Sequence, residues 1–272
     1  MCEVLQVSRS GFYVYVPRQA AADAGAREVA LLTRVQAIAA ETRHSYGSRR
    51  MAKQLQDDGF AVGRYQARRL MRQAKVTVRR PKQRHPVTTD SRHGYRVAPN
   101  LLARHFAVEK PDQVWVGDIT YVWTAEGWLY LGVLLDLYSR KVVGWAMSQR
   151  VDAALVQEAL QMALGRRQPA AGLIHHSDRG SQYACGAYQT LLAASGIRCS
   201  MSRKGDCLDN AVAERFFGSL KGECTSLRPY ATRQEAWDDV IDYIEMFYNS
   251  KRLHSYLGYV SPNNFERLAR EA

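Results

Sequence analysis

Apolar side chains recur at helical spacing in three stretches near the start of the chain. Between Glu28 and Thr42, between Ser48 and Asp58, and between Arg64 and Ala74 they return every three or four positions, which predicts three amphipathic helices. Gly59 is expected to end the second of these helices. The residues before them, 1–18, predict a short helix and a turn that cannot bury a core by themselves.

The third of these stretches is strongly basic. Its apolar residues Ala67, Leu70 and Met71 share one face, and the other face carries four arginines: Arg64, Arg68, Arg69 and Arg72. Short helices with a glycine-bearing turn and a basic last helix resemble a helix-turn-helix, whose last helix enters the major groove of DNA. The alternative is a basic face that is only solvated. We expect residues 1–75 to form a helical, helix-turn-helix-like DNA-binding region.

Residues 76–110 lose the apolar periodicity and carry prolines and basic residues, which predicts a basic linker. Its charge suits it to lie along a DNA backbone, although a flexible tether would have the same composition. The periodicity that returns after residue 110 is of a different kind, and residues 111–272 are expected to form the second domain.

In that second domain, three runs rich in β-branched and aromatic residues predict an antiparallel meander. Helices and strands then alternate, with Asp152 expected to cap the first helix and Thr232 to begin a capping box before the last. The runs are Val114 to Trp123, Trp128 to Leu137 and Lys141 to Met147, followed by a helix to Leu164, a strand Leu173 to Ser177, a helix Gln182 to Ala194, a strand Ile197 to Met201, and two helices. The order β-β-β-α-β-α-β-α-α predicts an α/β, RNase H-like fold.

The positive charge of the chain is confined to its first part. The net charge is +12, yet residues 1–110 contain 21 Lys/Arg against 8 Asp/Glu, and residues 111–272 contain 17 against 18. A basic block of this kind indicates a polyanionic partner, since neutralised phosphates release counterions. No run is apolar enough for a membrane span or a signal peptide, and the five cysteines have no C-x-x-C spacing. We expect a soluble, cytoplasmic protein with reduced thiols and neither a zinc site nor a membrane partner.

Three separated carboxylates are the candidate catalytic residues. Asp118 lies inside an apolar strand, Asp178 directly follows another strand, and Glu214 lies on a helix. There are 59 residues between the first two and 35 between the last two (119–177 and 179–213). An isolated Asp-Arg-Gly is usually a turn and an isolated helical Glu is usually solvated, but an unpaired Asp inside a strand is costly to bury. A Mg²⁺ site for phosphate chemistry would offset that cost.

Other polar residues near these acids have ordinary explanations. Asp136 is interpreted as a turn or core partner within plausible reach of the site, and Asp209 as a helix N-cap. His175 and His176 are interpreted as packing or hydrogen-bonding residues, because Mg²⁺ prefers oxygen ligands. Asn210 and Lys221 lie four residues before and seven after Glu214, on one helical face, and Lys221 could instead be a solvated lysine.

Several segments together resemble the integrase catalytic core of insertion-sequence transposases, in particular the second-reading-frame catalytic subunit of the IS-three family. The resemblance covers nearly the whole chain. The matching segments are Trp115 to Tyr121, Gly127 to Leu131, His176 to Tyr183, Asp209 to Phe217, and the C-terminal residues Tyr248, Asn249, Arg252, His254, Leu257, Gly258, Ser261 and Pro262.

The resemblance implies a set of roles for matching residues. Asp118, Asp178 and Glu214 would be the catalytic DDE residues and would hold two Mg²⁺ ions, for which Mn²⁺ can substitute, with Asp118 bridging them. Lys221 would contact DNA. Further residues expected along the DNA path are Asn210, Arg179, Arg203 and Lys204. Arg252 and His254 match the family pattern, without a catalytic role that we can argue from their chemistry.

The expected function is DNA transposition. The resemblance implies cleavage at the element ends, attack of the exposed 3′-hydroxyls on target DNA, a circular DNA intermediate, and assembly as a dimer or larger on paired ends. It also implies an upstream-frame subunit or fusion partner, and a location at the bacterial nucleoid. Two other hypotheses stay open: an RNase H-like nuclease that cuts without joining, and an inactive DNA-binding regulator of the element.

Overall fold

The computed structural model describes residues 4, 6–78, 94–203 and 210–271, without the side chains of residues 13–24. The chain divides into two compact units, Met1–Arg79 and Arg80–Ala272, which we describe separately. The expected boundaries after residues 75 and 110 stay predictions. No described helix is both long and apolar enough to cross a membrane.

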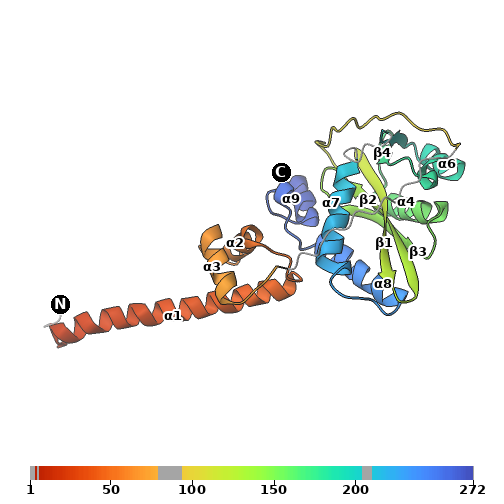
Figure 1. The fold of residues 1–272 in the computed structure, drawn as a ribbon. Coiled ribbons are helices and arrows are strands. Elements are labelled where there is room, and N and C mark those ends of the chain that lie inside the picture. Colours follow the sequence, from red (N-terminus) through yellow and green to blue (C-terminus); the bar gives the residue numbers. More distant parts are fainter. Residues whose placement is uncertain (1–3, 5, 79–93, 204–209, 272) are drawn as a thin grey trace. The chain divides into compact units, whose positions relative to one another are not determined.

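The first unit consists of helices α1 (Arg9–Glu41), α2 (Ser48–Asp57) and α3 (Arg64–Gln73) (Figure 1). Its core residues come from the predicted apolar positions of all three helices and are completely buried: Val35, Ile38, Met51, Leu55, Ala67 and Leu70. The prediction of a separate short helix and turn over residues 1–18 was wrong. Ser8 caps one long helix by accepting a hydrogen bond from the Gly11 N–H at 2.9 Å, and helix-favouring alanines follow.

The second unit is built on one five-stranded sheet with the strand order β3-β2-β1-β4-β5. Strands β1, β2 and β3 form the predicted antiparallel meander, and β4 and β5 run parallel to β1. The strands are β1 (Val114–Thr124), β2 (Gly127–Asp136), β3 (Val142–Ser148), β4 (Ile174–Ser177) and β5 (Arg198–Met201). The α/β, RNase H-like fold prediction is confirmed.

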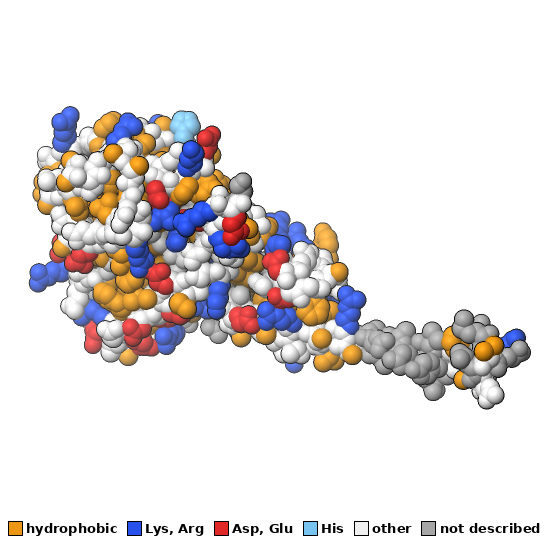
Figure 2. All heavy atoms as spheres, turned by 180° about the vertical axis from the view of Figure 1, so that it is seen from behind, with side chains coloured by type: hydrophobic (Ala, Val, Ile, Leu, Met, Phe, Trp, Pro, Cys, Tyr) orange, Lys and Arg blue, Asp and Glu red, His pale blue; other side chains and the backbone are white. Residues whose placement is uncertain are grey.

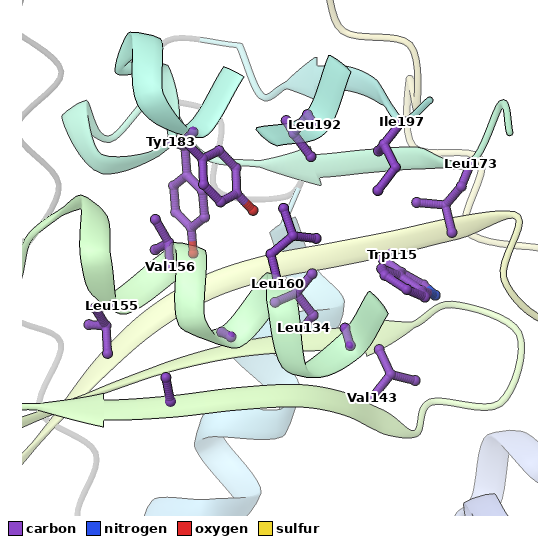
Figure 3. Packing of buried hydrophobic residues seen from close by; sticks show 14 of the residues in the cluster. Trp115, Leu134, Val143, Leu155, Val156, Leu160, Leu173, Tyr183, Leu192 and Ile197 are labelled. Atoms are coloured by element: carbon purple, nitrogen blue, oxygen red, sulfur yellow. The ribbon is translucent and has the colours of Figure 1, made fainter. Parts of the chain in front are cut away.

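Helices cover both faces of this sheet. Figure 3 looks onto the face covered by α4 (Ala153–Arg167), with α5 (Ser181–Ala184) and α6 (Gly186–Ala194) beyond it. Gly144 lets α4 approach β3 closely, because a Cβ there would collide with the backbone oxygen of Ala159. Helices α7 (Ala211–Leu220) and α8 (Arg233–Ile241) pack on β1 and β2 from the other side.

Several elements differ from the sequence-based expectation. The Glu214 helix continues as a π-helical segment η2 (Lys221–Thr225), and α8 continues as η3 (Asp242–Tyr248). A short helix η4 (Ser255–Leu257) and a helix α9 (Pro262–Glu271), which the sequence analysis did not predict, complete the second unit.

Part of the stretch expected to be a linker packs against the second unit. Leu102 is buried, and the backbone N–H groups of Leu101 and Leu102 donate to the Ser200 hydroxyl on β5 at 2.9 and 3.3 Å. The Met201 N–H donates to the Pro99 carbonyl. Residues 99–102 therefore extend the second unit beyond the outer strand of its sheet. The linker residues 79–93 lie outside the described residues.

Candidate active site

Asp118 lies in the middle of β1, on the strand face that it shares with Val116 and the buried Thr120. One of its carboxylate oxygens accepts a hydrogen bond from the Ile119 N–H at 2.8 Å. The pKa of Asp118 is raised well above its usual value by burial and then by the negative charge of Asp178, with a further contribution from Glu214. The ionised form of Asp118 is therefore unfavourable unless a cation lies close to it.

Asp178 is the first residue after β4, which runs parallel to β1 next to it. Its Oδ1 accepts the Gly180 N–H at 2.9 Å and closes a tight turn. The turn expected for an Asp-Arg-Gly sequence is thus present. The same carboxylate acts electrostatically on Asp118, so the turn holds Asp178 near β1.

Glu214 lies in the first turn of α7, and its side chain is exposed. Its charge also raises the pKa of Asp118, after burial and the charge of Asp178. Asn210 occupies the N-cap position of α7 but makes no capping hydrogen bond, and its buried Oδ1 has no hydrogen-bond partner among the described residues. Asp209, predicted as the N-cap, lies outside the described residues.

Lys221 is a cation whose charge acts on this group of acids. It follows the last residue of α7, and its Nζ lies 4.8 Å from the centroid of the Tyr121 ring. Burial lowers the pKa of Lys221, and the charge of Asp118 opposes that change. Lys221 in turn lowers the pKa of Asp118, so a partly buried positive charge acts on the acids. Its contact with DNA stays a prediction.

The three acids interact through space but are not gathered into a finished metal site. In the described part of the chain, no three Asp, Glu, His or Cys side chains form a group that could hold a metal ion as they stand. The chemistry of the donors nevertheless fits Mg²⁺, since all three offer carboxylate oxygen and the ionised form of Asp118 needs a positive partner. The assignment of these residues as metal ligands stays a prediction.

The other predicted DNA-binding residues of the second unit differ in environment. The Arg179 Nε donates to the Ser202 carbonyl at 2.7 Å, which ties the end of β4 to the end of β5. Arg203 is exposed, and Lys204 lies outside the described residues. Arg179 therefore has a structural contact as well as a place beside Asp178.

In the first unit, the four arginines of α3 are all exposed: Arg64, Arg68, Arg69 and Arg72. Arg69 approaches Glu28 of α1 at 4.0 Å. The buried face of α3 is formed by Ala67, Leu70 and Met71, so the predicted amphipathic pattern is confirmed. The charge of the second unit is mixed, and Figure 2 shows acidic and basic side chains interspersed over one side of it.

Asp136 belongs to a different polar cluster, as the sequence analysis preferred. It is completely buried and accepts the backbone N–H groups of Tyr138 at 2.8 Å and Asp112 at 3.1 Å. The Arg167 guanidinium lies 3.3 Å from it and also contacts Asp112 and Glu266. Burial raises the pKa of Asp136 to about 7.

The two histidines of β4 are also structural. His175 is completely buried, with its Nε2 3.0 Å from the Tyr188 hydroxyl, and burial lowers its pKa to about 3. The Nδ1 of His176 lies 2.8 Å from the Ser200 hydroxyl. A Cβ on Gly117 would lie 2.7 Å from His175 Nε2, so the glycine before Asp118 lets this histidine pack beneath β1.

Arg252, for which the sequence predicts no role, is the centre of a buried polar cluster. This buried guanidinium donates to both carboxylate oxygens of Glu223 at 2.6 Å and to the Ser219 hydroxyl at 3.0 Å. The Tyr243 hydroxyl donates to the same carboxylate at 2.8 Å. His254 lies 3.4 Å from Arg252 and edge-on to the Tyr248 ring. Because Glu223 lies in η2, this cluster fixes the end of α7. In the sequence, Arg252 is visible only as an arginine that follows an apolar helix. That position does not predict its ion pair with Glu223.

Comparison with known protein families identifies the class of both units. The Integrase core domain matches residues 108–207 and again 214–268, and an HTH-like domain matches residues 26–84. The catalytic core of HTLV-2 integrase, solved in complex with magnesium, aligns with 57% of this chain and 96% of its own, at 17% identity and a TM-score of 0.43. The family models show that the chain has an integrase core and an HTH-like domain.

The sequence relatives narrow this class to one family. An "Insertion element IS600 uncharacterized 31 kDa protein" from Shigella sonnei is 44% identical, with 97% of each chain aligned. "Transposase InsF for insertion sequence IS3A" from Escherichia coli (strain K12) is 41% identical over 98% of this chain and 92% of its own. The chain belongs to the IS3 transposase family, and it is an enzyme of the polynucleotidyl-transferase class.

Proposed function

We propose that this DDE transposase cleaves the ends of its insertion sequence and joins them to target DNA, with Asp118, Asp178 and Glu214 as its catalytic carboxylates. The observation that carries this proposal is the electrostatic effect of Asp178, Glu214 and Lys221 on the partly buried Asp118 in the middle of β1. Two acids, one directly after a strand and one on a helix, act on a third in the middle of a strand. Folding does not favour such a set of charges unless a cation joins it.

These carboxylates would hold two Mg²⁺ ions, and Mn²⁺ would substitute. When bound, the metal supplies charge stabilisation for the attacking and leaving oxygens of an in-line displacement. Lys221, partly buried beside Asp118, would hold a phosphate of the DNA near the acids. The Gly180 N–H would hold the Asp178 carboxylate in place, and α7 would present Glu214 from its first turn.

DNA would be bound by both units. Asn210, Arg179, Arg203 and Lys204 would line its path past the acids, and the exposed arginines of α3 would enter a major groove. Pairing of two element ends calls for a homo-oligomer, a dimer or larger. We further propose an upstream-frame subunit as a partner, and action in the cytoplasm at the nucleoid.

A strand-transfer assay tests the proposal. Pre-cleaved element-end DNA is incubated with the full chain in Mg²⁺ or Mn²⁺, comparing the wild type with Asp118→Asn and with Glu158→Gln as a matched control. Glu158 is an exposed carboxylate on α4, which packs on the other face of the sheet. Joined product in the wild type and control but not in Asp118→Asn is expected.

Other outcomes separate the rival functions. Cleavage without joining would favour a nuclease. Binding without either reaction, persisting after addition of the upstream-frame protein, would favour an inactive regulator. Calorimetric titration of Mg²⁺ gives a readout apart from activity: the heat of binding should be lost in Asp118→Asn and kept in Glu158→Gln.

A further inference from the structure

A row of aromatic side chains lies on one face of the hairpin formed by β1 and β2. Tyr121 pairs across the strands with Tyr130, and Trp123 with Trp128, so all four rings project to the same side. The ring centroids of Trp123 and Trp128 are 4.7 Å apart, and those of Tyr121 and Trp128 are 4.9 Å apart. We call Tyr121, Trp128 and Trp123 the aromatic row.

The outer end of the aromatic row is open to solvent. Trp123 is 59% exposed and Trp128 42% exposed, whereas Thr120, Val122 and Thr124 on the opposite face are buried. An antiparallel hairpin with one buried face usually carries polar residues on the other. Here the outward face is aromatic instead, and contiguous exposed apolar surface commonly marks a binding site.

Lys221 connects the aromatic row to the acids. Its Nζ lies 4.8 Å from the Tyr121 centroid, and its charge lowers the pKa of Asp118, which burial and neighbouring acids raise. Strand β4 pairs with β1 only from Val114 to Val116, so Lys221 approaches β1 beyond the end of that pairing. Tyr121 lies on the strand face opposite Asp118, three residues or about 10 Å further along β1, and Trp123 about 17 Å along. Lys221 acts on both Tyr121 and Asp118, so the two faces are connected at the edge of β1 beyond its pairing with β4.

We propose that the aromatic row stacks unpaired bases of the DNA strand next to the phosphodiester that is cut or joined. The inference rests on the function proposed above, which puts that phosphodiester at Asp118. A nucleotide offers both an aromatic face and a phosphate, and the row offers rings with a lysine at their inner end. Ring stacking and positive charge together are how proteins bind single-stranded nucleic acid without reading its sequence.

Cross-strand aromatic pairs also stabilise hairpins, so the test must separate stacking on DNA from hairpin stability. The full chain is titrated, without divalent metal, against a labelled duplex with a three-nucleotide single-stranded end, and against the same duplex whose end lacks its bases. Trp123→Leu keeps an apolar side chain without a ring face, Trp123→Phe restores a ring, and Tyr256→Ala removes an exposed ring outside the row. Melting curves by circular dichroism establish that each variant is folded.

The wild type is expected to bind the base-bearing end about tenfold more tightly than the abasic end, the size of one base–aromatic stack. Trp123→Leu should lose that preference, while Trp123→Phe and Tyr256→Ala should keep it. Equal binding of both ends by the wild type, or an unchanged preference in Trp123→Leu, would overturn the inference. The inference would also be overturned if Trp123→Leu changed only the oligomeric state measured by analytical ultracentrifugation. The aromatic row would then be a contact between two copies of the chain.

The two proposals fail in different ways. Metal-dependent strand transfer with no base preference would leave the transposase function in place and remove the role of the aromatic row. A Trp123-dependent base preference in a protein that never joins DNA would retain a single-strand site and remove the proposed chemistry.

Discussion

Asp118 is a residue whose environment opposes its charge. Burial and two neighbouring acids act against its ionised form, whereas the Ile119 N–H and Lys221 favour it. Such local destabilisation is common at functional sites, where activity and stability compete. Its position in the middle of an otherwise apolar strand was the signal that made it predictable from the sequence.

Replacing this charge should therefore stabilise the metal-free protein. We expect Asp118→Asn to raise the free energy of unfolding of the second unit by about 1–2 kcal/mol, because the repulsion from Asp178 and Glu214 is removed. Urea unfolding without divalent metal, followed by tryptophan fluorescence, measures this, since all five tryptophans lie in residues 111–272. Glu158→Gln, on an exposed helix face, should change little. A loss of stability in Asp118→Asn would mean that the carboxylate has a structural role.

Asp136 makes the stability of the protein depend on pH. Its pKa is raised to about 7 by burial, above the usual ~3.9 of an aspartate, so the folded state holds its proton more tightly than the unfolded state. The stability that comes from this proton is complete below about pH 4 and is lost as the pH rises through about 7.

The variant Asp136→Asn tests this pH dependence, because an asparagine side chain cannot ionise. Its stability relative to the wild type should rise by about 3 kcal/mol between pH 5 and pH 8, because about two pH units at 1.36 kcal/mol each separate pH 5 from the pKa of the folded state. Urea unfolding at pH 5, 6, 7 and 8 measures the difference. A difference that does not change with pH would show that Arg167, 3.3 Å away, keeps Asp136 ionised throughout.

At the scale of elements, the apolar pattern predicted the strands and most helices, but not how the helices continue. The β1–β2–β3 meander and the buried faces of α2 and α3 follow directly from periodicity. The π-helical segments η2 and η3 do not, because an added residue per turn depends on packing against other elements. Glu223 and Arg252 lie 29 residues apart, so no local pattern could reveal their pairing.

The ion pair of Glu223 and Arg252 should contribute strongly to the stability of the segment that follows α7. Removing Arg252 leaves the Glu223 carboxylate largely buried without its bidentate partner, so Arg252→Met should cost about 3–5 kcal/mol of unfolding free energy. The double variant with Glu223→Gln should regain part of that loss, since it leaves no unpaired charge. Urea unfolding of both single variants and the double variant gives the coupling energy. Additive losses would show that the two side chains act independently.

At the scale of the whole molecule, the excess positive charge and the candidate chemistry lie in different parts of the chain. The excess of basic residues precedes residue 111, while the acids, the aromatic row and Lys221 follow it. An exposed arginine face on α3 is suited to phosphate and groove contacts. The affinity that comes from phosphate contacts falls as the salt concentration rises. The helix-turn-helix arrangement was predictable because its helices are short and strongly amphipathic.

Arg68→Ala should therefore weaken binding to element-end duplex DNA and reduce the slope of log affinity against log salt by about 0.9 if the arginine neutralises one phosphate. Arg49→Ala is the matched control, because Arg49 is an exposed arginine of the same unit on α2 and its loss changes the net charge equally. Fluorescence anisotropy between about 50 and 200 mM salt gives both slopes. If α3 lies on the DNA, only Arg68→Ala flattens the slope. Equal slopes for both variants would mean that the first unit binds DNA through its overall charge, with no special place for α3.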